Sequence, residues 1–192
     1  MRDYKNGKLI YHLTSLSNLD SILDDGLLPR NQLWDFTDVA DSEIIECRRE
    51  YSLDSYVPFH FFPMNPFDVR VQKANKGETF IIIALKRSYA RSEGFKILTQ
   101  HPLSLEEIKL YDYDEGVEQI DWDLMNERDY SNHFCKQVCM AECLIDRSID
   151  PSEFSIIYVK DEKTKKAVDR INADRYDFQV SIWSNMFCSI KS

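Results

Sequence analysis

Glycine spacing is the feature of this sequence that most restricts the folds it can adopt. The chain has five glycines, and no two of them lie closer than 17 residues apart. A P-loop needs two glycines five positions apart, and a dinucleotide-binding fingerprint needs three within six positions. Both motifs are therefore excluded, so any nucleotide that binds here must be held by side chains and isolated turns.

The composition is that of a globular protein with an acidic balance. Of 192 residues, 43% are hydrophobic, and 24 Lys and Arg stand against 33 Asp and Glu, for a net charge of −9. At roughly 150 residues per domain, residues 1–192 are expected to form one domain. Domains that coat duplex DNA are usually basic, so the charge leaves room only for a small local basic site.

No segment of the sequence has the pattern of a targeting signal. Residues 1–8 are polar and charged, and the longest apolar run, 80–85, is far shorter than the ~20 residues of a membrane span. Five cysteines without a secretory signal indicate reduced thiols. We therefore expect a cytoplasmic protein that makes no membrane contact.

Strands and helices are interspersed without a regular βαβ repeat, which predicts an α+β or mixed α/β class. The expected strands are 8–14, 56–62, 79–85, 95–99, 153–160 and 178–183. The expected helices are 17–28, a turn or structured loop near 44–49, 88–93, a short helix opened by a capping box at 104–107, 131–145 and 161–173. Ser17 is the candidate N-cap of the first helix, and Gly26 its stop.

Three cysteines, Cys135, Cys139 and Cys143, are spaced by four in the predicted helix 131–145. On a helix they form one stripe about 12 Å long, which is too extended for a single metal ion. Free cysteine is among the most buried residue types. The stripe therefore predicts a core face, and no metal site is expected.

Several polar residues have both a structural and a functional interpretation. Glu142 stands among apolar neighbours, where a carboxylate needs either a cationic partner or a function. His12 and His60 are each more often satisfied core histidines than site residues in such a context, and the pair Arg48-Arg49 is more often surface charge than a binding site. Local pattern alone leaves these alternatives open.

The order of the motifs resembles the DarT family of DNA ADP-ribosyltransferase toxins. The motifs are Tyr-His-Leu-Thr at 11–14, Asn-Leu-x-Ser-Ile-Leu-x-x-Gly-Leu-Leu at 18–28, Arg-Arg at 48–49, Tyr-Val-Pro-Phe-His-Phe-Phe-Pro-x-Asn-Pro-Phe at 56–67 and Met-Ala-Glu-Cys-Leu-Ile at 140–145. The first two also occur elsewhere in the ADP-ribosyltransferase superfamily, including RNA 2′-phosphotransferases. The resemblance, over about residues 8–160, implies the ADP-ribosyltransferase fold, with two small packed β-sheets around an NAD cleft and flanking helices.

The resemblance also implies the site. NAD would be the co-substrate, without a metal, and Glu142 and Arg48 would be the catalytic residues. The cofactor-binding positions implied are His12, Thr14, Asn18, Gly26, Arg49, His60 and Phe67. Which of the two adjacent arginines meets NAD stays open. The apolar neighbours of Glu142 predict a raised pKa for its carboxyl group.

The chain departs from the family pattern in two places. The position of His60 is often tyrosine in the family, and the segment before Glu142 is less basic than usual, with Lys136 as the candidate substitute. The Asn-Pro-Phe form at 65–67 favours, weakly, the guanine-modifying branch over the thymidine-modifying branch.

The function that the resemblance implies is transfer of ADP-ribose from NAD to a base in single-stranded DNA, with guanine slightly favoured over thymine. The protein would be a toxin of a toxin–antitoxin or phage-defence system, with a macrodomain-type antitoxin as its partner. Two alternatives remain: an ADP-ribosyl- or 2′-phosphotransferase acting on RNA, and an inactive member that binds a nucleotide or a partner.

Overall fold

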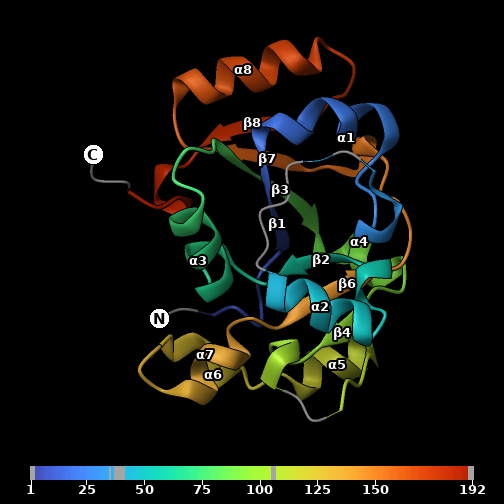
Figure 1. Cartoon of the computed structure of the whole chain (residues 1–192), viewed down its shortest axis with the longest axis vertical. Helices are drawn as coiled ribbons and strands as arrows, with labels where there is room; N and C mark the ends of the chain where they lie inside the picture. Colours follow the sequence, from blue (N-terminus) through green and yellow to red (C-terminus); the bar gives the residue numbers. More distant parts are fainter. Residues whose placement is uncertain (1–2, 35, 37–41, 105–106, 190–192) are drawn as a thin grey trace.

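The fold is built on one eight-stranded sheet in the order β5-β4-β6-β2-β1-β3-β7-β8 (Figure 1). This computed structural model describes residues 3–34, 36, 42–104 and 107–189. The strands are β1 (Leu9–Ser15), β2 (Val57–His60), β3 (Phe80–Lys86), β4 (Lys96–Leu98), β5 (Tyr111–Asp112), β6 (Glu142–Ile145), β7 (Ile156–Val159) and β8 (Gln179–Ile182). The α-helices are α1 (Leu19–Asp25), α2 (Ser42–Glu50), α3 (Pro66–Ala74), α4 (Arg87–Ser92), α5 (Tyr113–Gln119), α6 (Trp122–Glu127), α7 (His133–Val138) and α8 (Glu162–Asn172).

The two halves of the sheet meet at a narrow seam between β1 and β2. Strand β1 pairs with β3 along its whole length, whereas it pairs with β2 only at Tyr11 and His60. Beyond that pair the two strands diverge, and Pro58 on β2 has no backbone N–H to donate to a ladder. The seam therefore opens a gap between two half-sheets.

This seam refines the expectation of two packed sheets. The α+β class is confirmed, but the two expected sheets are joined into one because the single Tyr11–His60 pair bridges them. The cleft expected between two sheets corresponds to the gap at the seam.

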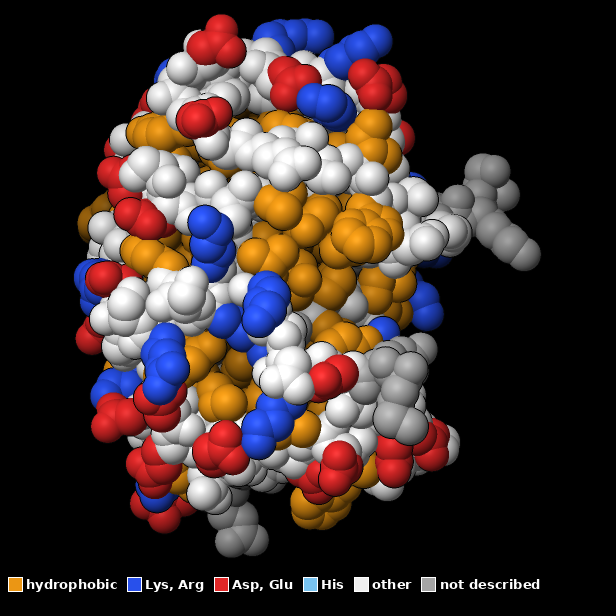
Figure 2. All heavy atoms as spheres, turned by 180° about the vertical axis from the view of Figure 1, so that it is seen from behind, with side chains coloured by type: hydrophobic (Ala, Val, Ile, Leu, Met, Phe, Trp, Pro, Cys, Tyr) orange, Lys and Arg blue, Asp and Glu red, His pale blue; other side chains and the backbone are white. Residues whose placement is uncertain are grey.

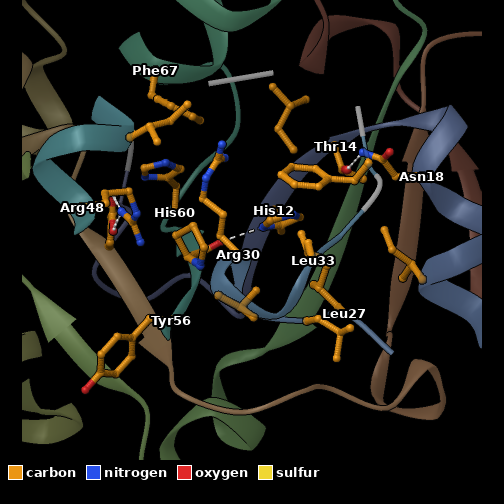
Figure 3. Close-up of a pocket in the computed structure, with 18 of the residues that line it drawn as sticks. His12, Thr14, Asn18, Leu27, Arg30, Leu33, Arg48, Tyr56, His60 and Phe67 are labelled. Atoms are coloured by element: carbon orange, nitrogen blue, oxygen red, sulfur yellow. Dashed lines mark hydrogen bonds and ion pairs between the residues drawn. The ribbon is translucent and has the colours of Figure 1, made fainter. Parts of the chain in front are cut away.

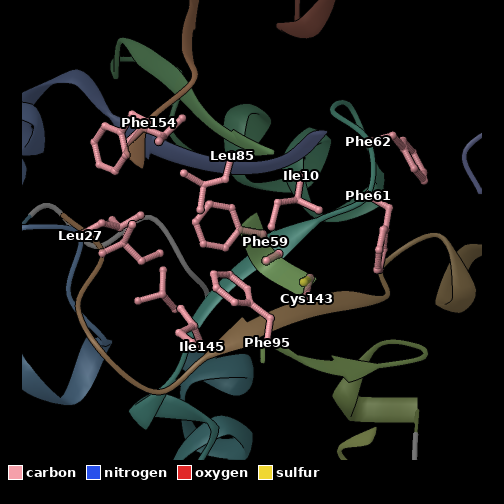
Figure 4. Packing of buried hydrophobic residues seen from close by; sticks show 14 of the residues in the cluster. Ile10, Leu27, Phe59, Phe61, Phe62, Leu85, Phe95, Cys143, Ile145 and Phe154 are labelled. Carbon is pink, nitrogen blue, oxygen red and sulfur yellow. The ribbon is translucent and has the colours of Figure 1, made fainter. Parts of the chain in front are cut away.

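The main core lies under the faces of β1, β2, β3, β4 and β6 that α1, α4, α5 and α8 cover. Figure 4 shows Phe59 and Phe95 packed between Ile10, Leu85 and Ile145. The run Phe80–Leu85 is buried throughout, as expected for a strand covered on both faces. A second cluster packs α3 and the C-terminal segment against the other face of β1, β3 and β7.

Most predicted elements are present, but the helix expected at 131–145 is wrong. Helix α7 ends at Val138, and the chain then turns into strand β6, which pairs with both β2 and β4. Cys135, Cys139 and Cys143 are all buried, as the core interpretation predicted, but they do not form one helical stripe. The hydrogen bonds to two neighbouring strands outweigh the helical spacing of an apolar run.

Other differences are local. The first helix begins at Leu19 after a 3₁₀ turn, so its N-cap is Asn18 and not Ser17. The helix expected from the capping box is not formed at 107–110, while 105–106 lie outside the described residues. Helix α3, which the sequence analysis missed, carries a recognisable signature: the Asn65 side chain accepts from the Asp68 N–H, and Pro66 follows the cap.

Charged side chains of both signs are spread over the visible rear face. Figure 2 shows acidic and basic side chains interspersed around an apolar area at the centre of the rear face.

All five cysteines are free thiols. Among the described residues, no helix is long and apolar enough to cross a membrane, and no cluster of three His, Cys, Asp or Glu side chains suits a metal ion.

Candidate active site

A cleft opens at the seam of the sheet and collects most of the site residues that the sequence predicted (Figure 3). Its walls come from β1, from α1 and the segment after it, from α2, and from β2 and β6. The predicted residues that line it are His12, Thr14, Asn18, Arg48, His60, Phe67 and Glu142. Residues of β1, β2 and β6, which are far apart in the chain, thus line one cleft at the seam.

Arg48 and Glu142 form a buried ion pair in this cleft. Nη1 of Arg48 donates to both carboxylate oxygens of Glu142, at 2.9 Å and 2.7 Å. Nη2 of Arg48 donates to the Leu53 carbonyl at 3.1 Å, which fixes the guanidinium. The two residues are 8% and 5% exposed. The pair therefore joins α2 to β6 and sets one charged group of each sign on the wall of the cleft.

The pairing reverses the pKa shift expected for Glu142. Burial raises the pKa of this carboxyl group, but the charge of Arg48 and its hydrogen bonds outweigh burial, so the pKa lies below its usual range. The expectation of a raised pKa was wrong because it considered the apolar neighbours in sequence and not the cation that the fold brings in. Glu142 is therefore a carboxylate at neutral pH.

Strand β6 also fixes the direction of Glu142. In the antiparallel register, Glu142 lies directly opposite His60 on β2 and Leu98 on β4. Residues opposite one another in antiparallel strands share a face of the sheet. His60 and Glu142 therefore reach the cleft from the same face, and Nδ1 of His60 donates to the Ala141 carbonyl at 3.1 Å.

His12 bridges the seam through its side chain. Its Nδ1 donates to the Pro58 carbonyl at 2.8 Å, across the gap where β1 and β2 no longer pair. Burial lowers the pKa of His12 to about 4, so the ring is neutral at physiological pH. Since Nδ1 carries the proton in this hydrogen bond, Nε2 is left with a lone pair and can accept a hydrogen bond from a ligand.

Of the five remaining predicted residues, three line the cleft and two do not. The amide of Asn18 donates to the Thr14 hydroxyl at 3.2 Å, so these two residues form one polar corner of the cleft, and Phe67 lies against the His60 ring with centroids 5.4 Å apart. Gly26 does not line the cleft; it ends α1 at φ 87°, and an added Cβ would lie 3.0 Å from the Ile149 carbonyl oxygen. Arg49 is exposed and does not line the cleft either.

Sequence reasoning missed two polar residues of the cleft. Arg30, from the 3₁₀ turn Arg30–Gln32, directs its guanidinium into the middle of the cleft, 5.2 Å from the Phe36 ring (Figure 3). His101 follows β4, and burial lowers its pKa to about 4. His101 stands in the loop after a strand, a place where functional residues are common, whereas nothing in the local sequence distinguishes Arg30 from a surface arginine.

The charged lining suits a small anion-bearing ligand. Two arginines, Arg30 and Arg48, face one carboxylate, Glu142, and the histidines that line the cleft add polar nitrogens. Guanidinium groups hold a diphosphate through planar, paired hydrogen bonds. Arginine side chains are thus the groups with which a cleft that has no glycine loop can bind phosphates.

Comparisons with known proteins show which family and which fold the chain is similar to. The family model described as "ssDNA thymidine ADP-ribosyltransferase, DarT" matches residues 11–188. A curated relative, the "DNA ADP-ribosyl transferase-DNA ADP-ribosyl glycohydrolase fusion protein" of Thermosipho africanus (strain H17ap60334), is 27% identical over 184 residues, covering 85% of this chain and 46% of the relative. The chain therefore spans about half the length of this curated relative.

Solved structures show the same fold. "Thermus sp. 2.9 DarT in complex with ADP-ribosylated ssDNA" matches with a TM-score of 0.85 and 20% identity, over 97% of this chain and 99% of that one. "Thermus sp. 2.9 DarT in complex with NAD+" matches with a TM-score of 0.78 and 17% identity, over 95% and 98%. "Thermosipho africanus DarTG in complex with ADP-ribose" matches with a TM-score of 0.73 and 22% identity, over 94% and 51%. The expected fold is confirmed.

Proposed function

The chain belongs to the DarT family of ADP-ribosyltransferases, and from this membership we propose that it transfers ADP-ribose from NAD to a base in single-stranded DNA. The observation that carries the proposal is the buried Arg48–Glu142 pair on the wall of a cleft lined by the family's motifs. Two of the similar Thermus structures, one in complex with NAD+ and one in complex with ADP-ribosylated single-stranded DNA, support the choice of both substrates.

NAD fits the polar groups of the cleft. Its diphosphate would meet Arg30 and Arg48, whose guanidinium groups match the geometry of phosphate oxygens. Nε2 of His12 would accept a hydrogen bond from a ribose hydroxyl or from the nicotinamide amide, beside the Thr14–Asn18 corner. His60 and Phe67 would pack against the nicotinamide side, and Gly26 would act indirectly, by holding the turn between α1 and the cleft residues Leu27 and Leu28.

Glu142 has the protonation state that the reaction requires. The bond between the nicotinamide nitrogen and ribose C1′ breaks, positive charge develops at C1′, and nicotinamide leaves as a neutral molecule. An ionised Glu142 near the ribose stabilises that charge. The attacking base nitrogen then forms the new bond to C1′ and loses a proton, which Glu142 accepts. Arg48 keeps Glu142 ionised through its charge and its hydrogen bonds to the carboxylate.

The target base has two candidates, each with its own support. Thymidine is supported by the matching family model, which is described as a thymidine ADP-ribosyltransferase. The Asn65-Pro66-Phe67 segment favours guanine, and Phe67 lines the cleft where the base must arrive. Four oligonucleotides, each with one type of base at a central position in a common flanking sequence, distinguish the candidates by which strand gains the mass of one ADP-ribose.

The same assay tests the enzyme itself. Wild-type protein and NAD are expected to add one ADP-ribose to at least one single-stranded oligonucleotide and none to its duplex. Glu142→Gln, which keeps the size and polarity of the side chain, is the matched variant and should give no adduct. An RNA strand of the same sequence tests the alternative of an RNA-directed enzyme. NAD binding by a wild type that modifies no strand would favour the inactive alternative.

We further propose a cellular role as a toxin, carried out in the cytoplasm by residues 1–192 acting as one catalytic unit. The fusion relative joins a transferase to a glycohydrolase, which supports a macrodomain-type antitoxin that removes the modification. Expression of the wild type should then stop growth, and Glu142→Ala or co-expression of such a hydrolase should restore it. Unimpaired growth at a verified level of active enzyme would contradict the toxin role.

A further inference from the structure

The polar corner of the cleft, Thr14 and Asn18, lies at the end of strand β1. The amide of Asn18 donates to the Thr14 hydroxyl at 3.2 Å, and Figure 3 shows this bond at one side of the cleft. Between the two residues the chain leaves β1 and makes the 3₁₀ turn Leu16–Asn18. The geometry of this turn therefore sets how the two side chains are placed relative to each other.

Ser15 is the N-cap of this turn, and it is buried outside the cleft. Successive side chains of a strand point to opposite faces of the sheet, so Ser15 points away from Thr14. Its Oγ accepts from the Ser17 backbone N–H at 3.2 Å, which holds the start of the turn. Ser15 is 1% exposed and is not among the residues that line the cleft. It is therefore placed to fix the turn and not to bind a ligand in the cleft.

The Ser15 hydroxyl uses its full capacity for hydrogen bonds. It donates its proton to Oε2 of Glu78 at 2.8 Å. Its oxygen also lies 2.8 Å from the Ser17 hydroxyl, which is the donor in that bond because the Ser15 proton already goes to Glu78. A serine hydroxyl has one proton and two lone pairs. With one bond donated and two accepted, the group is held in a single orientation.

Glu78 reaches this turn from a distant part of the chain. It lies 63 positions after Ser15, between helix α3 and strand β3. The carbonyl of the next residue, Thr79, accepts from the Leu16 N–H at 2.7 Å. The turn is thus held by one backbone bond and one side-chain bond from the same dipeptide. The side-chain bond is of the stronger, charge-assisted kind because its acceptor is a carboxylate.

Glu78 itself lies outside the cleft. It is not among the residues that line the cleft, and it lines a separate cavity together with Leu16 and Thr79. It therefore has no direct contact with a ligand bound in the cleft, and the bond to Ser15 is its connection to the Thr14–Asn18 corner.

We propose that Glu78 is a positioning residue for NAD, which acts through Ser15 to hold the turn that presents Thr14 and Asn18 to the ligand. The inference rests on the proposed function, in which this corner meets NAD, and adds to it a residue outside the cleft. Without the carboxylate, the Ser15 hydroxyl has no acceptor and the turn is less well ordered. NAD then has to order the corner as it binds, which lowers its affinity.

The test compares Glu78→Ala with Glu78→Gln. Alanine removes the acceptor, and KM for NAD should rise about tenfold, the loss expected for one charge-assisted hydrogen bond. Glutamine keeps an oxygen within reach of the Ser15 hydroxyl, so its KM for NAD should stay within about threefold of the wild-type value. The matched control, Glu93→Ala, removes an exposed carboxylate that pairs with Arg147 and lines neither cavity. It should leave KM for NAD unchanged.

Two readouts separate positioning from a loss of folding. In Glu78→Ala, kcat at saturating NAD and KM for the DNA strand should change little, whereas partial unfolding would lower kcat and leave KM for NAD as it was. Direct binding of NAD, measured by calorimetry in the Glu142→Gln background so that NAD is not consumed, should weaken by the same factor as KM rises.

A double-mutant cycle tests the route through Ser15. Ser15→Ala alone should raise KM for NAD at least as much as Glu78→Ala does. The double variant should then be no worse than Ser15→Ala, since both changes break the same bond. Effects that multiply in the double variant would mean that Glu78 acts by another route, and they would overturn the proposal.

The remaining outcomes distinguish this inference from the proposed function. If the wild type transfers ADP-ribose while Glu78→Ala keeps the wild-type KM for NAD, the role of Glu78 is overturned and the proposed function stands. A rise in KM for DNA alone, or a Glu78→Gln variant as weak as Glu78→Ala, also overturns it. If the wild type neither binds NAD nor modifies a strand, both proposals fail together.

Discussion

Two buried arginines in this molecule have the same exposure and opposite surroundings. Arg48 and Arg87 are each 8% exposed. The guanidinium of Arg87 donates to three backbone carbonyls, those of Leu9, Lys5 and Phe61, at 3.1, 3.0 and 3.2 Å. It also stacks on aromatic rings. Arg48 donates instead to a carboxylate, that of Glu142, on the wall of an open cleft.

The difference shows how to tell a structural cation from a functional one. The partners of Arg87 are carbonyl oxygens, which neither titrate nor move, so its charge ties the N-terminal segment to β1 and β2. The partner of Arg48 titrates, and the cleft gives a ligand access to both groups. The two arginines are equally buried, so burial does not distinguish their roles. What distinguishes them is the partner, which is a set of backbone carbonyls for Arg87 and a titratable carboxylate for Arg48.

The largest expected effect is on the rate of transfer, and it comes from replacing Glu142, the partner of Arg48. Glu142→Gln should lower the rate of transfer by about 10²–10⁴-fold, since it removes the charge and the proton acceptor but keeps an oxygen for Arg48. Initial rates with saturating NAD measure the effect, and a thermal melt confirms that the variant is folded. A rate within threefold of the wild type would show that Glu142 is not a catalytic residue.

Arg87→Met should have the largest effect on stability. Three buried carbonyls would lose their donor, so the free energy of unfolding should fall by about 3–5 kcal/mol. Because the three carbonyls that accept hydrogen bonds from Arg87 do not titrate, the loss should be nearly the same at pH 5 and pH 8. Urea unfolding at both values measures it. A marked dependence on pH would mean that Arg87 has an ionisable partner after all and would weaken the comparison.

Arg48→Met should cost less stability, about 2–4 kcal/mol at pH 7, and the cost should depend on pH. In the wild type, Arg48 holds the pKa of Glu142 below its usual value, so this stabilisation is fully present above pH 4.5 and is lost as the pH falls through the lowered pKa. In the variant, burial without the cation raises the pKa of Glu142, and the carboxyl group takes up a proton. Urea unfolding should thus show the cost shrinking from pH 7 toward pH 4, and a constant cost would contradict the account.

His12→Asn should have the smallest effect on the free energy of unfolding. It tests whether His12 is buried at the seam in its neutral form. The pKa of His12 is about 4 when folded and near 6.5 when unfolded, so its contribution to stability is complete above pH 6.5 and is lost as the pH falls toward 4. Asparagine can still donate to the Pro58 carbonyl but does not titrate, so stability should depend less steeply on pH in this range. His101, with a similar pKa, keeps part of the slope in the variant. An unchanged slope would show that His12 is not buried in its neutral form.

How far the sequence could be interpreted differs between the two half-sheets. The half made of β1, β3, β7 and β8 was predicted closely, because long apolar runs such as 79–85 and a helix ended by Gly26 carry strong local signals. In the other half, β2 and β4 were predicted at 56–62 and 95–99, but β6 was not, because the cysteines at 135, 139 and 143 have helical spacing and the strand Glu142–Ile145 has only four residues. Its pairing with two strands is a tertiary effect.

The site shows the same limit. Glu142, His12 and Arg48 were identified through the order of motifs, but their geometry depends on contacts between residues far apart, 94 positions in the case of Arg48 and Glu142. The fold brings Arg48 to the carboxylate and thereby reverses its pKa shift. Arg30 was missed because nothing in its local sequence separates a cleft arginine from a surface one.

The central claim is that the cleft containing Arg48 and Glu142 transfers ADP-ribose to a single strand. The most direct measurement is to quantify released nicotinamide and modified oligonucleotide in the same reaction. The account predicts one nicotinamide for each ADP-ribose added by the wild type, and neither product from Glu142→Gln. Nicotinamide release without an adduct on any strand, or adducts formed equally well by Glu142→Gln, would contradict it.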